Sequence, residues 1–364
     1  MKMPQLTVRA LRCTPVEVPM KHVLGTSRAA IRAAPLMLID LETEEGIVGR
    51  AYLFCYLRAA AAGIAGMLGE IERLVKGQRV EPQVQFAALA KRFTLIGVQG
   101  IVRMALSGFD LAAWDALAVA AGQPLATFIG AKPRPIRAYN SNGLGLMEPA
   151  RLADEAEELL EGGFAAVKLR LGHETLAGDL AALRAVRERI GRNIEIMVDY
   201  NQALSVDEAL GRGRALDDEG VYWLEEPIRH DDYAGAARLA QALRTPVQIG
   251  ENFSLPAAMA EALERGACDY AMPDVERIGG VTGWLQAAEL AAARGIPMSS
   301  HLFPEVCAHL LAATPTAHWL EYVDWAGAIL EEPAVVQEGA VVPSGRPGAG
   351  IAWNADAVER YRIP

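Results

Sequence analysis

The chain has 364 residues, of which 52% are hydrophobic and 22% charged, so it is long enough for a barrel-sized domain and a smaller one. Its 45 acidic residues outnumber 35 basic ones, and this negative balance excludes a nucleic-acid-binding or anionic-membrane-binding surface. No apolar run reaches the roughly 18 residues that a bilayer span needs. The first ten residues, MKMPQLTVRA, lack the apolar core of a signal peptide. We therefore expect a cytoplasmic protein that is not bound to a membrane.

The first third of the chain combines strand-like and helix-like segments. The residue pattern predicts strands at 8–18 and 35–54, and the turn-like TEEG folds the second range into a hairpin. A helical period then runs from about residue 59 to 121. The two prolines of KPRPIR (132–137) indicate a linker after this region.

From residue 136 onward, short apolar strands alternate with amphipathic helices such as 149–163 and 281–295. Eight strands are expected, at 136–141, 165–171, 194–201, 222–227, 247–252, 270–275, 297–301 and 318–324. Strands that are regularly bridged by helices favour a parallel (β/α) barrel over an open sheet. No glycine-rich phosphate fingerprint follows the first of these strands, which disfavours dinucleotide binding.

Charged residues recur within or at the C-terminal ends of seven successive strands. They are Lys168 and Arg170, Asp199, Glu225 with Glu226, Glu251, Asp274, His301 and Glu321. A barrel builds its active site at this end, where the strand ends and the following loops converge. A single charged residue there usually caps a helix or pairs with a neighbour. Several buried carboxylates at one mouth, however, repel one another unless a cation lies among them.

Three consecutive strands supply carboxylates, from Asp199, Glu225 and Glu251. Oxygen ligands without cysteine or clustered histidine suit Mg²⁺ or Mn²⁺ better than zinc. Such an ion can hold a substrate carboxylate and the negative charge that develops when the α-carbon loses its proton. The structural alternative is a set of salt bridges at the barrel mouth.

Acid-base chemistry is expected from two pairs of residues. Lys168 and Arg170 are two apart on one strand and share a face. There they can clamp a carboxylate, and a lysine crowded by another cation has a depressed pKa and is a plausible base. His301 ends a later strand, and Asp274, which ends the strand before it, can orient its imidazole.

Long ordered motifs relate the chain to a known family. They are VDYNQ (198–202), WLEEP (223–227), IGEN (249–252), MPD (272–274), IGGVTGW (278–284), SSHLF (299–303) and AHLLAATPTAHWLE (308–321). In these motifs the chain resembles the mandelate racemase branch of the enolase superfamily. The resemblance implies an α/β fold with a modified (β/α)₇β barrel at 135–329. It also implies an α+β capping domain at 1–130, completed by the tail 330–364. A homo-oligomer, often an octamer in this family, is a further expectation.

The resemblance also implies a role for each metal and acid-base position. Asp199, Glu225 and Glu251 would bind Mg²⁺, with Mn²⁺ as an alternative. His301, supported by Asp274, would be a general acid/base. The substrate, a small carboxylate, would contact further residues. Glu321 would donate a hydrogen bond to its carboxylate as an enediolate forms, Lys168 would contact the same carboxylate, and Ser141 and Asn201 would lie near substrate and metal.

Two departures from the family pattern bear on the reaction, and the capping loop bears on the substrate. Arg170 replaces the second lysine of the family's K-x-K motif, which is its other catalytic base, and arginine stays protonated near neutrality. Arg277 stands where a lysine usually follows MPD. The capping loop at 22–32 contains Ser27, Arg28 and Arg32, which suggests an anionic or polyhydroxylated substrate.

Three functions remain open at this point. A racemase or epimerase of a 2-hydroxy carboxylic acid would use His301 and a group near Arg170 as its two bases, and the close motif match favours it slightly. An acid-sugar dehydratase would use His301 as the acid that expels a β-hydroxyl, and Arg170 and the polar loop favour it. A non-catalytic carboxylate-binding barrel is disfavoured, because a pure binder has little use for the retained His301 and Glu321.

Overall fold

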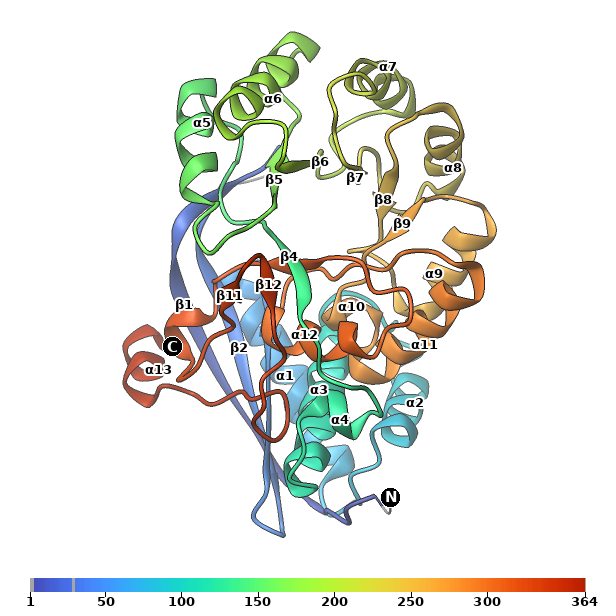
Figure 1. Cartoon of the computed structure of the whole chain (residues 1–364). Coiled ribbons are helices and arrows are strands. Elements are labelled where there is room, and N and C mark those ends of the chain that lie inside the picture. Colours follow the sequence, from blue (N-terminus) through green and yellow to red (C-terminus); the bar gives the residue numbers. More distant parts are fainter. Residues whose placement is uncertain (1–2, 28–29, 364) are drawn as a thin grey trace.

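The N-terminal sheet is antiparallel and forms the base of the cap. A computed structural model describes residues 3–27 and 30–363. The sheet has the order β1-β2-β3, with β1 (Val8–Gly25), β2 (Ala30–Thr43) and β3 (Val48–Phe54). The hairpin between β2 and β3 turns at TEEG, as predicted, whereas β1 is longer than the expected 8–18. The long strands of this sheet extend up beside the barrel in Figure 1.

Helices pack on this sheet and complete the cap. The predicted helical region at 59–121 contains α1 (Arg58–Val75), α2 (Pro82–Arg92) and α3 (Gly100–Ala120), and α4 (Leu125–Phe128) follows. Helix α3 is buried on all sides from residue 102 to 118, as expected for a core helix. It lies directly on β3, since a Cβ added at Gly49 would come within 2.1 Å of the carbonyl oxygen of Ala112.

The second part of the chain forms the predicted parallel barrel. Its strands are β4 (Ile136–Asn140), β5 (Ala166–Arg170), β6 (Glu195–Asp199), β7 (Leu224–Glu225), β8 (Val247–Ile249), β9 (Tyr270–Ala271) and β10 (Leu320–Tyr322). Strand β10 pairs in parallel with β4 and closes the sheet. In place of the strand expected at 297–301, isolated bridges join Met298 to Ala271 on one side and to Ala317 on the other. The eight-strand order is thus confirmed, with one strand reduced to bridges.

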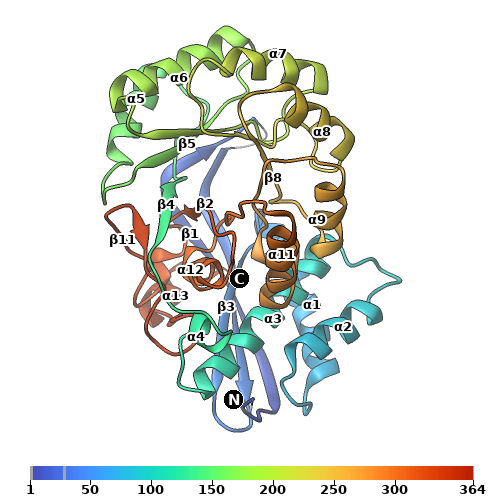
Figure 2. The ribbon, with the colours of Figure 1, turned by 45° about the vertical axis from the view of Figure 1, so that its right-hand side comes forward.

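Helices follow the barrel strands and surround them, as Figures 1 and 2 show. They are α5 (Pro149–Glu158), α6 (Leu176–Ile190), α7 (Val206–Leu216), α8 (Tyr233–Ala242), α9 (Leu255–Glu264), α10 (Val275–Ile278), α11 (Gly280–Arg294) and α12 (Pro304–Ala312). Side-chain caps fix the first residues of two of these helices. Ser205 and Glu208 form a capping box on α7, and Thr175 caps α6. The predicted modified (β/α)₇β barrel with an α+β cap is therefore confirmed.

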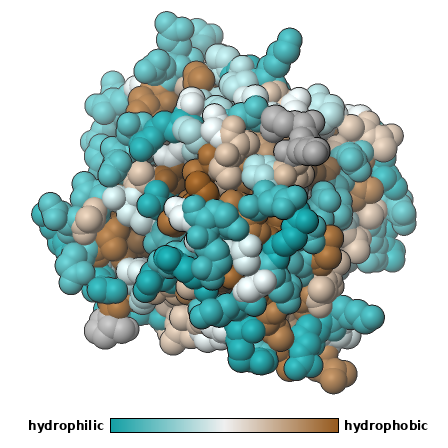
Figure 3. Space-filling model, turned by 90° about the horizontal axis from the view of Figure 1, so that it is seen from below, coloured by the Kyte–Doolittle hydropathy of each residue, from teal (hydrophilic) through white to brown (hydrophobic). Residues whose placement is uncertain are grey.

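The C-terminal tail contacts both parts of the molecule. It follows η1 (Gly327–Ile329) and contains β11 (Val336–Gln337), β12 (Ala340–Val341) and α13 (Ala355–Tyr361). Strand β12 pairs with β4 of the barrel, while Ile363 donates its backbone N–H to Pro15 of the cap sheet. In Figure 1 α13 lies beside β1. Most of the face seen from below is hydrophilic, with hydrophobic side chains in small groups (Figure 3). Among the described residues no helix is long and apolar enough to cross a membrane.

Two rows of side chains inside the barrel explain where the polar site begins. The lower row is an apolar cluster of Tyr139, Ala166, Met197, Trp223 and Trp319. Two positions further along the same segments lie Ser141, Lys168, Asp199, Glu225 and Glu321, all buried. Because side chains alternate along a strand, each residue of the second row faces the same interior as the residue two before it. The charged row therefore rests on an apolar floor and faces the C-terminal mouth.

Candidate active site

A cavity of about 470 Å³ lies between the barrel mouth and the cap. Its polar wall comes from the barrel and contains Lys168, Arg170, Asp199, Asn201, Gln202, Glu251, Asn252, Arg277, His301 and Glu321. Its apolar wall contains Leu24, Ile31, Phe54, Tyr56 and Leu57 from the cap, with Leu302 and Trp325. The cavity is therefore amphipathic, with charge on one side and hydrocarbon and aromatic rings on the other.

The described part of the loop at 22–32 lines the cavity with Leu24, Thr26 and Ile31, so its contribution there is one polar and two apolar side chains. Ile31 faces the cavity while the neighbouring Arg32 is exposed, because successive side chains of β2 point to opposite faces. Ser27 donates its hydroxyl to the carbonyl oxygen of Tyr200, at 3.3 Å. Arg28 lies outside the described residues.

Lys168 is buried among carboxylates from three other strands. Its Nζ lies 2.5 Å from Oε1 of Glu225, 2.7 Å from Oε1 of Glu321 and 3.5 Å from Oδ2 of Asp199. Burial by itself would lower the pKa of Lys168, but the three carboxylates outweigh it and raise this pKa. The predicted depression of the Lys168 pKa by Arg170 is therefore wrong, and the ammonium form prevails.

Asp199 and Glu225 end neighbouring strands and are held by different donors. The backbone and side-chain nitrogens of Asn201 donate to Asp199, at 2.7 and 2.9 Å, and Asn201 adopts the left-handed region with φ 46°. The indole Nε1 of Trp223 donates to Oε2 of Glu225 at 2.9 Å. Burial raises the pKa of Glu225 to about 8, although Lys168 opposes the shift.

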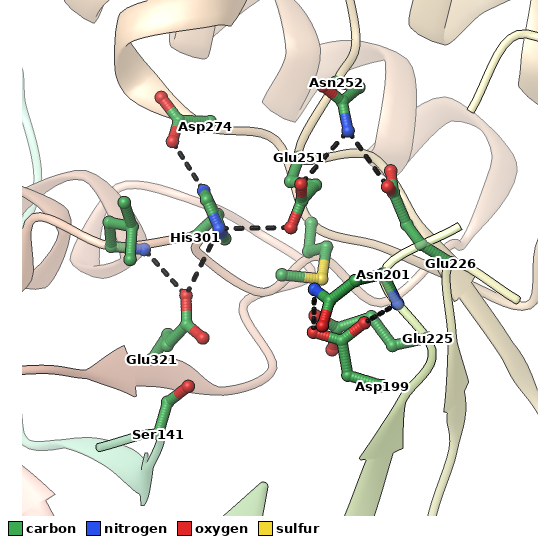
Figure 4. Close-up of polar contacts among 12 residues, drawn as sticks. Ser141, Asp199, Asn201, Glu225, Glu226, Glu251, Asn252, Asp274, His301 and Glu321 are labelled. Carbon is green, nitrogen blue, oxygen red and sulfur yellow. Dashed lines mark hydrogen bonds and ion pairs between the residues drawn. The ribbon is translucent and has the colours of Figure 1, made fainter. Parts of the chain in front are cut away.

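Glu226 and Glu251 are joined by one amide, as Figure 4 shows. Nδ2 of Asn252 donates to Oε2 of Glu226 at 2.9 Å and to Oε1 of Glu251 at 3.0 Å. Burial, followed by the charges of Glu251 and Asp199, raises the pKa of Glu226 well above its usual range. Asn252 has no role predicted from the sequence, although its place directly after Glu251 in IGEN is a usable signal.

Arg277 keeps the positive charge expected after MPD. Its Nη1 donates to Oδ1 of Asn252 at 2.7 Å and to the backbone carbonyl oxygen of Glu251 at 3.1 Å. Its guanidinium carbon also lies 4.7 Å from the centre of the Tyr56 ring. Burial opposes ionisation of Glu251, but His301 and Arg277 outweigh it and hold the Glu251 pKa below its usual range.

His301 and Asp274 are brought together as predicted. Nδ1 of His301 lies 2.5 Å from Oδ2 of Asp274, while Nε2 lies 3.2 Å from Oε2 of Glu251. Oδ1 of Asp274 accepts the backbone N–H of Glu276 at 2.7 Å, which caps α10 and anchors the carboxylate. Burial lowers the His301 pKa, but the surrounding carboxylates outweigh burial and raise it well above its usual value.

Glu321 lies between Lys168 and His301 and forms an ion pair with each of them. Its Oε2 accepts the backbone N–H of Leu302 at 2.8 Å and lies 3.9 Å from Nε2 of His301. Burial opposes ionisation, but Lys168 and His301 lower the Glu321 pKa to about 2. The carboxylate is thus ionised and accepts hydrogen bonds in this structure.

Arg170 is a buried guanidinium with fixed partners. Nη1 donates to the carbonyl oxygen of Gly143 at 2.7 Å, and Nη2 donates to the hydroxyl of Ser141 at 2.9 Å. Within the described residues, no carboxylate oxygen lies within 4.0 Å of Arg170, and its buried Nε has no hydrogen-bond partner. Ser141, expected near the substrate, is therefore held by Arg170 and is not among the residues that line the cavity.

The donor set fits a hard divalent cation, although the side chains are not yet arranged around one. Across the described ranges, no three His, Cys, Asp or Glu side chains surround a common point that suits a metal ion. The Lys168 ammonium explains this, because it occupies carboxylate oxygens of Glu225 and Asp199. The buried Oε1 of Glu226 has no hydrogen-bond partner, which is the feature that a cation would satisfy.

Two family models match most of the chain. Residues 8–130 match "Mandelate racemase / muconate lactonizing enzyme, N-terminal domain", and residues 151–357 match "Enolase C-terminal domain-like". The first range covers the antiparallel sheet and its helices. The second covers most of the barrel and part of the tail.

Three relatives illustrate the similarity. L-talarate/galactarate dehydratase of Salmonella typhimurium is 29% identical, over 96% of this chain and 88% of its own length. The crystal structure of an enolase from alpha proteobacterium bal199 with bound magnesium is 44% identical, with a TM-score of 0.96 over 98% of this chain and 100% of that one. An enolase from Bradyrhizobium complexed with magnesium and mandelic acid is 40% identical, with a TM-score of 0.95 over 100% of both chains.

Proposed function

The chain belongs to the mandelate racemase / muconate lactonizing enzyme family of the enolase superfamily, and on that basis we propose that it is an acid dehydratase. In this proposal His301 removes the α-proton of a 2,3-dihydroxy carboxylate and the β-hydroxyl then leaves as water. The observation that carries the proposal is the asymmetry of the cavity. An acid-base dyad, His301 with Asp274, stands on one side, and an immobilised arginine stands in place of a second base.

A divalent cation is part of this proposal. Asp199, Glu225 and Glu251 would hold Mg²⁺, as both magnesium-bound relatives suggest, with Mn²⁺ as an alternative. When bound, the cation supplies positive charge that stabilises the negative charge developing on the substrate carboxylate. Asn201 supports the site by holding both oxygens of Asp199.

The remaining polar residues would bind and orient the substrate. The Lys168 ammonium faces the cavity with a permanent charge and would pair with the substrate carboxylate. Glu321 lies between Lys168 and His301 and, once it takes up a proton, would donate a hydrogen bond to the same carboxylate as the electron density of that carboxylate increases. Ser141, held by Arg170, would border the substrate on the other side.

The proton balance requires one acid-base group. Nε2 of His301 accepts the α-proton, the C–H electron pair forms the enediolate, and the β C–O bond then breaks. The same His301 returns the proton to the departing hydroxyl, so that water and an enol form, and the enol tautomerises to a 2-keto-3-deoxy acid. The raised pKa of His301 favours the imidazolium that this second transfer needs, and it opposes the first transfer, which needs the neutral imidazole.

Arg170 limits proton transfer on the face of the substrate that is opposite His301. A guanidinium is a poor base, and the bonds of Arg170 to Ser141 and Gly143 keep it in place. With a base on one face only, the enediolate regains a proton on the same face or loses a β-substituent. The dehydratase from Salmonella typhimurium, which matches 96% of the chain, supports the second course.

A racemase or epimerase is the second candidate, because a different observation favours it. The apolar wall of the cavity suits a 2-hydroxy acid with an apolar substituent, and the Bradyrhizobium relative was crystallised with mandelic acid, which has no β-hydroxyl to lose. In this case a proton would have to be delivered near Arg170 on the opposite face.

Incubation with acids in D₂O and MgCl₂ distinguishes these functions. The library contains both configurations of aryl 2-hydroxy acids and a set of 2,3-dihydroxy mono- and diacids. Keto-acid formation supports the dehydratase, and deuterium at C2 with inverted configuration supports the racemase. Absence of both exchange and product throughout the library would contradict both and favour a non-catalytic carboxylate-binding barrel.

The assembly and the domain division are also proposals. The family resemblance suggests a homo-oligomer, in particular an octamer, and light scattering of the purified chain measures its mass directly. The division into a cap at 1–130 with 330–364 and a barrel at 135–329 can be examined by limited proteolysis, which would cut first near 131–135.

A further inference from the structure

The adjacent residues Glu225 and Glu226 have different surroundings. Both oxygens of Glu225 are engaged: Oε1 by Lys168 at 2.5 Å, and Oε2 by Trp223 at 2.9 Å and Gln248 at 3.4 Å. Glu226 is only 1% exposed, yet its Oε1 has no hydrogen-bond partner among the described residues. A buried carboxylate oxygen without a donor is costly, so the structure holds an acceptor that lacks its partner.

The backbone holds Glu226 firmly in an unusual conformation. Its φ of 33° lies in the region that L-residues rarely adopt. Its N–H donates to the carbonyl of Gln248 at 3.1 Å, and its own carbonyl accepts the N–H of Gln202 at 2.7 Å. The Glu226 side chain points toward the amide of Asn252, as Figure 4 shows.

Asn252 links Glu226 to a proposed cation ligand. Its Nδ2 donates to both Glu226 and Glu251, at 2.9 and 3.0 Å, while its Oδ1 accepts from Arg277 at 2.7 Å. Because Arg277 can only donate, it fixes the amide with its NH₂ group toward the two carboxylates. The two carboxyl groups are thereby linked through one amide, and Oε1 of Glu226 is left without a hydrogen-bond partner among the described residues.

We propose that Glu226 is a further carboxylate of the cation site and acts together with Glu251. This inference rests on the proposed function, because it presumes that a divalent cation binds at the barrel mouth. Asn252 positions the two carboxylates before the cation arrives, and the unpartnered Oε1 of Glu226 is the oxygen that the cation satisfies. Hard divalent cations prefer such carboxylate oxygens.

The test compares Mn²⁺ binding to the full chain and to two variants by electron paramagnetic resonance. Glu226→Gln keeps the shape and removes the charge. Glu276→Gln is the matched control, since Glu276 is 0% exposed and also has an unpartnered Oε1, but Phe54 donates to its other oxygen. We expect Glu226→Gln to raise the Mn²⁺ dissociation constant at least about tenfold, and Glu276→Gln to change it less than about twofold.

Two further measurements keep the result interpretable. A third variant, Glu226→Asp, retains the charge on a shorter side chain and should bind Mn²⁺ with intermediate affinity. Thermal unfolding in EDTA should show that Glu226→Gln is folded, and added MgCl₂ should raise its melting temperature less than that of the wild type.

Three outcomes would overturn the inference. Glu226→Gln could bind Mn²⁺ as tightly as the wild type, or Glu276→Gln could weaken binding equally, which would point to a general effect of removing a buried acid. In both cases the proposed function stands. If the wild-type chain binds neither Mn²⁺ nor Mg²⁺, the proposed function fails first, so the two failures are distinguishable.

Discussion

His301 and Asp274 are joined twice, although 27 positions separate them in the chain. Nδ1 of the imidazole lies 2.5 Å from Oδ2 of the aspartate, and the two residues also pair as an isolated parallel β-bridge. The bridge places the backbone at 301, where the structure has no regular strand, next to the end of β9. The same pair of residues therefore ties the segment at 301 to the segment that follows β9 and orients the proposed base.

Replacing Asp274 with asparagine should slow proton transfer at His301. The change removes the negative charge that supports the imidazolium, and we expect α-proton exchange to fall by about 10²- to 10⁴-fold. Deuterium incorporation from D₂O, followed by NMR, measures the rate. Mn²⁺ affinity serves as the control and should stay within about twofold, because Asp274 is not among the proposed ligands. An exchange rate close to that of the wild type would show that the dyad is not the base.

Arg170→Lys should add inversion to the reaction. A lysine can lose a proton and is too short to keep both bonds that Arg170 makes to Ser141 and Gly143. With a 2-hydroxy acid in D₂O, we expect the variant to form deuterated product of inverted configuration, measured by chiral chromatography. Arg170→Met is the control and should not invert. Inversion by the wild type at a comparable rate would mean that the native site already has two bases.

Lys168→Met should destabilise the metal-free protein. The change leaves the carboxylates of Asp199, Glu225 and Glu321 buried without their shared ammonium, a loss of about 3–5 kcal/mol in unfolding free energy for a broken buried pair. Added MgCl₂ should stabilise this variant more than the wild type, because the cation no longer competes with Lys168.

Thermal unfolding in EDTA and in MgCl₂ measures both effects of Lys168→Met. The exposed Lys76→Met is the control for loss of a positive charge, and we expect it to change stability by less than about 0.5 kcal/mol. A melting temperature of Lys168→Met equal to that of the wild type in EDTA would contradict the prediction.

His309 should make the fold sensitive to acid. Burial lowers its pKa to about 4, while an unfolded histidine has a pKa near 6.5. Between these values the unfolded chain binds more protons, so the contribution of His309 is complete above pH 6.5 and decreases as the pH falls toward 4. Relative to His309→Gln, the wild type should lose about 2 kcal/mol of unfolding free energy between pH 7 and pH 5. Urea unfolding at both pH values measures this, and parallel changes in the two proteins would refute it.

The barrel and its dyad were predictable from local pattern. Each strand is a short apolar run followed by an amphipathic helix, and parallel strands that alternate with helices have one compact arrangement. That arrangement places Asp274 and His301 at the same end of adjacent strands. The pKa of Lys168 was not predictable from local pattern. The only charged residue within two positions of Lys168 is Arg170, and this neighbour predicted a lowered pKa for the lysine. The carboxylates that raise this pKa come from strands 31 to 153 positions away, as the separations of Asp199 and Glu321 from Lys168 show.

Sequence motifs determined the family and the identity of the charged residues at the mouth, because both depend on residue type. The spacing of strands and helices determined the barrel with its cap, because this spacing follows from local periodicity. Only the tertiary structure decided how those charges pair. It placed Lys168 among three carboxylates, tied Arg170 to Ser141, joined Glu226 to Glu251 through Asn252, and turned Ile31 rather than Arg32 toward the cavity. Electrostatic energies depend on distance and burial, and both are set by segments that lie far apart in the chain.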